Sequence, residues 1–180
     1  SLKDFKDRPL GSAIYNPESQ IVARRISRRK QQLDADFFTR RFQRARQLRE
    51  SLSEIDPMVC RLAWSEADGL PGVIVDRYGD HLVLQTLTLA MEKKKELIAR
   101  TLVDIFSPVS ITERNDSPIR KAEGLDLIVG MLHGEAPDPF PQKIGGLGFT
   151  LTAALGAGHK TGLYLDQLDN YQKVAGHARG

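Results

Sequence analysis

The feature that most constrains the fold is an ordered series of elements in the middle of the chain. The predicted order is strand, strand, helix, strand and strand, at residues 73–78, 81–88, 91–106, 109–114 and 125–132. Gly79 and Asp80 supply a two-residue hairpin connection between the first two strands, and Pro108 ends the helix because proline lacks the amide hydrogen. This order predicts a compact α+β unit with the helix on one face of an antiparallel or mixed sheet.

Two further strands are predicted nearer the N-terminus, at residues 8–15 and 20–27, with a turn at 16–19 between them. Two strands cannot bury a core unaided. Partner strands are therefore expected from sequence that would precede Ser1.

A long amphipathic helix is predicted after these strands, running to about Leu52. Asp34 or Asp36 can cap its first turn, since a carboxylate accepts hydrogen bonds from the unpaired amides there. The apolar stripe at helical spacing consists of Phe38, Phe42, Ala45, Leu48 and Leu52. Its aromatic residues are expected in the core rather than as a base-stacking platform.

The C-terminal part begins with residues 137–141, a proline-rich stretch that is predicted to be an extended connector. A strand is expected near residues 149–152, and a last helix near the end of the chain. Asp166 and Asp169 fall in the first turn of that helix, where carboxylates favour the positive end of the helix dipole. We therefore expect these two aspartates to stabilise the helix rather than to take part in catalysis.

Positive charge is concentrated at the N-terminal end. The net charge is +3, but residues 1–52 carry 13 Lys/Arg against 6 Asp/Glu, whereas residues 53–180 carry 13 against 17. This asymmetry favours a polyanionic partner, nucleic acid first, while a solvated helix face with scattered arginines explains the charge equally well. The candidate RNA-binding residues are Arg24, Arg25, Arg28, Arg29, Arg40 and Arg44.

Composition also bears on location and chemistry. No apolar run approaches the roughly 18 residues of a membrane span, and no secretory signal opens the chain. The single cysteine, Cys60, excludes an intrachain disulfide and fits a cytoplasmic location. We expect Cys60 to be a buried small hydrophobe rather than a nucleophile. No metal site is predicted, because the four histidines are widely separated and no cysteine pair occurs.

Residues 158–167, Gly-His-Lys-Thr-Gly-Leu-Tyr-Leu-Asp-Gln, combine small, basic, aromatic and paired polar side chains, as a loop that handles a charged small molecule would. The stretch does not match a phosphate-binding P-loop, because His159 separates Gly158 from Lys160. A second polar stretch, at residues 113–121, is expected to be a solvated loop.

Three segments together resemble one protein family. They are Gly11-Ser-Ala-Ile-Tyr-Asn-Pro-Glu-Ser-Gln-Ile21, Glu66-Ala-Asp-Gly-Leu-Pro-Gly-Val-Ile-Val-Asp-Arg77 and residues 158–167, in this order and at similar separations. The family is the S-adenosylmethionine-dependent methyltransferases that make 5-methylcytosine in large-subunit ribosomal RNA, also called ribosomal RNA large subunit methyltransferase I. The resemblance covers nearly the whole chain.

The resemblance implies a plan of three parts. Residues 1–52 look like the C-terminal half of a PUA domain, a small RNA-binding β-barrel. Residues 53–142 match the family's central α+β domain, and residues 143–180 resemble the hairpin and first helix that lead into a Rossmann-like methyltransferase domain. On this plan the chain is truncated before the catalytic domain, so it is expected to hold no catalytic residue and to be inactive alone.

The resemblance also implies S-adenosyl-L-methionine as cofactor, with a pocket that is incomplete in this chain. The residues implied to lie beside that pocket, or to order the chain there, are Lys160, Thr161, Gly162, Tyr164, Asp166 and Gln167. The family usually has arginine after Asp-Gln, whereas this chain has Leu168. The contact made by that arginine is therefore not expected here.

The expected function is that of the N-terminal part of an RNA methyltransferase with ribosomal RNA as partner and no membrane association. In the intact family enzyme, a cysteine thiolate attacks C6 of cytosine, and C5 then takes the methyl group. The sequence is also compatible with a homodimer. The alternatives are a non-catalytic RNA-binding or assembly module, and a related methyltransferase that acts on another RNA or base.

Overall fold

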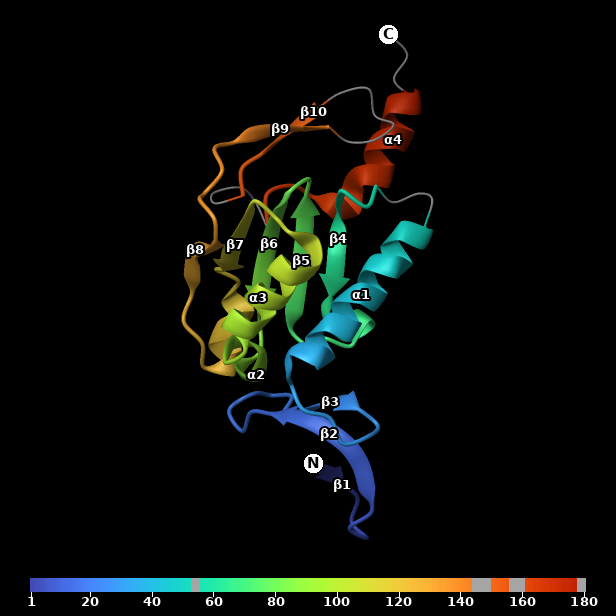
Figure 1. The fold of residues 1–180 in the computed structure, drawn as a ribbon, viewed down its shortest axis with the longest axis vertical. Helices are drawn as coiled ribbons and strands as arrows, with labels where there is room; N and C mark the ends of the chain where they lie inside the picture. The colour runs from blue at the N-terminus through green and yellow to red at the C-terminus, as the bar shows by residue number, and fades with distance from the viewer. Residues whose placement is uncertain (53–55, 144–149, 156–160, 178–180) are drawn as a thin grey trace.

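The computed structural model describes residues 1–52, 56–143, 150–155 and 161–177. A small sheet lies at the N-terminal end, a larger sheet lies in the centre, and the C-terminal helix lies at the opposite end (Figure 1). The chain is therefore α+β, as expected.

The N-terminal sheet has three antiparallel strands in the order β1-β2-β3, namely β1 (Leu2–Lys3), β2 (Pro9–Tyr15) and β3 (Ala23–Ser27). The two predicted strands are present with slightly different ends, and β1 was not predicted. Within the described residues these strands form an open sheet and not a closed barrel.

Helix α1 (Ala35–Ser51) is capped by Asp34, whose Oδ1 accepts a hydrogen bond from the Phe37 amide at 2.9 Å. Asp34 rather than Asp36 is therefore the cap. The buried residues of the helix are Phe37, Phe38, Phe42 and Ala45. The predicted apolar stripe is buried over the first turns of the helix, but Leu48 and Leu52 near its end are 49% and 39% exposed.

The central sheet has five strands in sequence order, where four were predicted. They are β4 (Val59–Trp64), β5 (Val73–Tyr78), β6 (His81–Thr86), β7 (Ser110–Asn115) and β8 (Ile128–His133). Only β6 and β7 are parallel, so the sheet is mixed. Strand β4 was not predicted, because Arg61 interrupts its apolar run. The Arg61 side chain donates a hydrogen bond to Asp76 on β5.

The predicted helix at residues 91–106 is divided into α2 (Leu89–Glu92) and α3 (Lys95–Phe106). Ser107 follows in the left-handed conformation, with φ of 45°, and Pro108 comes next. Figure 1 shows α1 and α3 side by side on one face of the central sheet.

One hydrophobic core joins both sheets to these helices. It includes Ile14 and Ile26 of the N-terminal strands, Phe38 of α1, Val75 of β5 and Leu102 of α3. Helix α1 therefore packs with the sheet that follows it in sequence. The division into domains at residue 52 stays a prediction.

A second, smaller hydrophobic cluster lies on the other face of the sheet. Tyr78 and Val83 of the sheet pack there with Ala153 and Leu155. The connecting chain forms a two-stranded antiparallel sheet from β9 (Phe140–Lys143) and β10 (Thr150–Ala153), so the start of β9 replaces part of the extended connector that was predicted. The short η3 (Leu165–Gln167) and α4 (Leu168–His177) end the described chain.

Among the described residues, no helix combines the length and apolarity needed to cross a bilayer. In the same part of the chain, no group of three or more His, Cys, Asp or Glu side chains is arranged to hold a metal ion. Cys60 is 5% exposed, and burial raises the pKa of its thiol to about 11. It is a packed residue rather than a reactive one, as expected.

Candidate functional site

The candidate site is the place where the segment that starts at Thr161 meets strand β5. The Thr161 hydroxyl donates a hydrogen bond of 2.5 Å to Oδ2 of Asp76 and lies 3.0 Å from the Tyr78 hydroxyl. The Leu163 amide donates to the same Tyr78 oxygen at 3.1 Å. Three hydrogen bonds therefore fasten the start of the segment to one strand, and we call this group of contacts the β5 anchor.

Asp76 is fully buried, so its charge needs a partner. Arg61 on the neighbouring strand provides one, since its Nε and Nη2 donate to the two carboxylate oxygens at 2.9 and 3.1 Å. This two-pronged geometry is the strong form of an arginine–carboxylate contact. The anchor is thus linked through Asp76 to β4.

Tyr78 keeps its proton at neutral pH. Burial of the phenol, together with the nearby Asp76 carboxylate, raises the pKa of Tyr78 to about 12. Its hydroxyl can therefore both donate and accept, which the contacts with Thr161 and Leu163 require.

Gly162 lets the segment approach the sheet closely. Its φ is +144°, and a Cβ at this position would lie 2.9 Å from Cδ2 of Leu155 and 3.5 Å from the Tyr78 ring. A side chain would clash with Leu155 as well as straining the backbone.

The six residues implied as donor-binding divide into different roles. Thr161 is 1% exposed with its hydroxyl already bonded, so it orders the chain. Tyr164 is 41% exposed, and Oε1 of Gln167 accepts from Asn170 at 2.7 Å. Asp166 lies in η3. Lys160 falls outside the described residues. That these residues border a methyl donor stays a prediction.

The six arginines implied as RNA-binding also differ in their surroundings. Arg24 lies between carboxylates, 3.3 Å from Glu66 and 3.5 Å from Glu123, and Arg40 is paired with Asp36. The exposed remainder are Arg25, Arg28, Arg29 and Arg44. Of the six arginines, these four are therefore the main candidates for contact with a polyanion.

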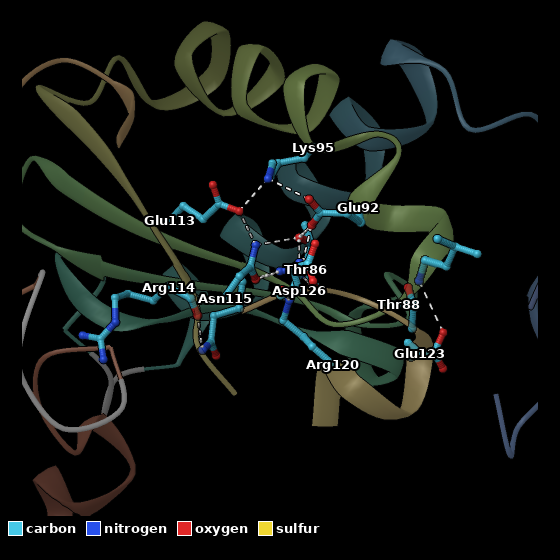
Figure 2. Close-up of polar contacts among 12 residues, drawn as sticks. Thr86, Thr88, Glu92, Lys95, Glu113, Arg114, Asn115, Arg120, Glu123 and Asp126 are labelled. Carbon is cyan, nitrogen blue, oxygen red and sulfur yellow. Dashed lines mark hydrogen bonds and ion pairs between the residues drawn. The ribbon is translucent and has the colours of Figure 1, made fainter. Parts of the chain in front are cut away.

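Sequence reasoning missed a buried polar network beneath α2 and α3 (Figure 2). Lys95 lies between two carboxylates, with Nζ 2.7 Å from Glu92 and 2.6 Å from Glu113. Asn115 donates to Glu113 at 2.6 Å and to Thr86 at 2.9 Å. The stretch 113–121 is thus not simply a solvated loop, because its first residues lie on the interior strand β7.

These contacts favour the charged form of the Glu92 carboxyl in the network. Burial raises the pKa of the Glu92 carboxyl, but hydrogen bonds from Lys95, Thr86 and Arg120 outweigh it and hold that pKa below its usual range. Arg120, 1% exposed, also donates to the backbone oxygens of Thr86 and Asp126. The one sequence signal was the spacing of Glu92 and Lys95, three residues apart on a helix.

The turn η2 (Pro118–Glu123) connects this network to the N-terminal sheet. At its far end, Glu123 accepts hydrogen bonds from Ser19 at 2.5 Å and Asn16 at 2.9 Å. Burial raises the pKa of the Glu123 carboxyl, but these bonds and one from the Leu89 amide outweigh it and lower the pKa overall.

Proteins named ribosomal RNA large subunit methyltransferase I are similar to this chain. The one from Vibrio cholerae is 42% identical over 92% of the chain, the one from Vibrio parahaemolyticus is 43% identical over 92%, and the one from Aliivibrio fischeri is 40% identical over 94%. The chain spans only 42–43% of the length of these relatives. No protein-family model matches it.

Two solved structures share the fold. A candidate SAM-dependent methyltransferase from Streptococcus mutans has a TM-score of 0.77 over 96% of this chain and 44% of its own, at 22% identity. A candidate methyltransferase complexed with SAH has a TM-score of 0.78 over 96% of this chain and 43% of its own, at 23% identity. At these identities the likeness establishes the fold alone.

Proposed function

We propose that this chain is the N-terminal part of an S-adenosylmethionine-dependent methyltransferase that acts on large-subunit ribosomal RNA. The observation that carries the proposal is the identity of 40–43% to proteins of that name over more than nine tenths of the chain. Because the chain spans less than half of those relatives, methyl transfer is proposed for the full-length protein.

In this proposal the β5 anchor positions the segment that borders the methyl donor. S-adenosylmethionine supplies a methyl group on a positively charged sulfur when it is bound. The described residues are compatible with such a ligand, because Thr161 is bonded inward and Tyr164 beyond it is 41% exposed. The Gln167 side chain, whose Oε1 accepts from Asn170, also carries an amide donor. In this proposal the anchor orders the chain, and residues after it contact the donor.

The proposal extends to the RNA. We infer that residues 1–52 are a PUA-like RNA-binding part and that the modified position is C5 of cytosine, as the resemblance implies. The exposed arginines of β3 and of the residues that follow it support the first inference, since guanidinium groups pair well with phosphate. No residue of this chain is assigned a role in the methyl-transfer step itself.

Donor binding separates this proposal from a non-catalytic RNA-binding module. Calorimetric titration with S-adenosylmethionine should give saturable binding to the full-length protein and no saturable heat with the 180-residue chain. If neither the full-length protein nor the 180-residue chain binds S-adenosylmethionine, the non-catalytic RNA-binding module is favoured. Micromolar binding to the 180-residue chain would show that the donor site has been misplaced.

A further inference from the structure

The face of the central sheet opposite α1 and α3 carries an open row of side chains. The strand register places Trp64 beside Ile74, and Ile74 beside Gln85, so these three side chains point to the same side. Asp76 and Tyr78 of the anchor also point to this side, because they alternate with Val75 and its neighbours in the core. The row therefore lies on the same face as the β5 anchor.

Trp64 is 56% exposed, although a large aromatic side chain gains most from burial. It lies at the end of β4, an edge strand of the sheet. The Arg61 guanidinium lies over its ring in a cation–π contact, with Cζ 5.5 Å from the ring centroid. The same Arg61 is bonded to Asp76, so the ring is connected to the anchor by direct contacts.

An open cleft of about 370 Å³ lies next to Trp64 on the sheet, since Arg61 and Ile74, the two neighbours of Trp64, line it. It is lined by Arg61, Ile74, Gln85, Arg114, Asp116 and Ser117. The polar lining consists of Arg61, which is paired with Asp76, Arg114, which is paired with Asp116, and the Gln85 amide and Ser117 hydroxyl, while Ile74 is apolar. Arg114 also donates to the Leu155 carbonyl at 3.0 Å, so the cleft borders the chain that leads to Thr161.

We propose that this face, defined by Trp64, Arg61 and the adjoining cleft, binds single-stranded RNA, with an unpaired base stacked on Trp64. The inference rests on the proposed function, because a substrate strand has to pass close to the methyl donor and this face adjoins the donor segment. Aromatic and guanidinium planes on an open sheet are the groups that unpaired bases stack on. The basic N-terminal part supplies phosphate contacts elsewhere on the same chain.

The chain itself offers a direct probe. Trp64 is its single tryptophan, so tryptophan emission, excited selectively over the four tyrosines, reports on this position alone. A short fluorescein-labelled single-stranded oligoribonucleotide should bind the 180-residue chain, as followed by anisotropy. The unlabelled oligonucleotide should change the Trp64 emission with the same affinity. A duplex of the same sequence should change it less.

Substitutions test the contact independently. Trp64→Ala should weaken binding of the single strand by about tenfold or more, whereas Trp64→Phe should retain much of the affinity because a ring remains. Val109→Ala is the matched control, since Val109 is also exposed, at 61%, but hydrogen-bonds to Asp80 at the opposite end of the sheet. This control should bind as the unchanged chain does.

The outcomes separate the two proposals. If the labelled RNA binds but Trp64 emission and the affinity of Trp64→Ala are unchanged, this face is not the RNA surface while the proposed function stands. If the emission instead changes with protein concentration in the absence of RNA, a second copy of the chain covers the face and the inference is overturned. If no RNA binds the 180-residue chain, this inference fails, and methyl transfer by the full-length protein tests the proposed function separately.

Discussion

At the scale of single residues, Thr161 matters because both partners of its hydroxyl are buried on β5. Asp76 and Tyr78 would each lose a hydrogen bond if that hydroxyl were removed. A buried carboxylate that loses a partner is costly, and the cost can be relieved by a shift of the segment. The effect of such a change should therefore appear at the donor site.

We expect Thr161→Val to weaken S-adenosylmethionine binding by the full-length protein by about tenfold, the lower end of a charge-assisted hydrogen bond. Thr161→Ser should restore most of the affinity. Thr101→Val makes the same change at a buried hydroxyl that donates to the Leu97 carbonyl within α3, and it should leave donor affinity unchanged. Equal affinity in all variants would remove the anchor from the account of donor binding.

Residue-level prediction from sequence was uneven. The stretch 158–167 was singled out from its residue types and was then assigned to the donor pocket through the resemblance, but its partners Asp76 and Tyr78 on β5 were not predicted. Glu113 and Asn115 were missed because charge and polarity suggest exposure unless their partners are known. Lys95, which offsets the Glu113 charge, comes from a different element, and no local pattern connects the two.

At the scale of elements, patterns that repeat over many residues were predicted well. The helical period of its apolar residues identified α1, and short apolar runs next to turn residues identified β5 and β6. Strand β4 was missed because Arg61 interrupts its apolar run and its partner Asp76 is distant in sequence. Strand β9 was missed because prolines suggested an extended connector. In the part of the chain that the structure describes, this strand pairs with β10.

The capping of α1 gives a test at this scale. Asp34→Ala should lower the free energy of unfolding by about 1 kcal/mol, because the Phe37 amide loses its acceptor. Asp36→Ala removes an exposed pair with Arg40 and should cost only about 0.3–0.5 kcal/mol. Urea denaturation measures both values. A larger loss for Asp36→Ala would mean that the cap has been assigned to the wrong carboxylate.

At the scale of the whole molecule, Glu123 connects the N-terminal sheet to the central sheet through Asn16 and Ser19. Its folded-state pKa is lowered, so the unfolded chain binds more protons over the pH range where the carboxyl titrates. The stability that Glu123 contributes is therefore present above its unfolded pKa, about 4.3, and is lost as the pH falls through the folded value.

We accordingly expect Glu123→Gln to lower stability near neutral pH and to make stability less dependent on pH below about 4.3. Thermal unfolding across an acidic pH series measures this. Asp104→Asn, a change at an exposed carboxylate of α3, is the control. Parallel curves for Glu123→Gln and the unchanged chain would show that the carboxylate does not hold the sheets together.

The distribution of charge gives a second test of the whole chain. Replacing Arg25, Arg28 and Arg29 with Ala should weaken RNA binding and flatten the log–log salt dependence by about 0.7 per lost phosphate contact with a single strand. Arg24→Ala should change the slope less, because Arg24 is already paired with carboxylates. An unchanged slope after the triple substitution would indicate that these arginines only face solvent.

The most direct measurement is transfer of a labelled methyl group from S-adenosylmethionine to large-subunit ribosomal RNA by the full-length protein, followed by nucleoside analysis. The expected product is 5-methylcytosine. Gln167→Ala and Lys160→Ala should reduce transfer by about ten- to a hundredfold, whereas Cys60→Ala should not, since the Cys60 thiol is a buried packing group that donates to the Pro57 carbonyl. Label in another base would contradict the substrate assignment, and equal transfer by all three variants would contradict the site.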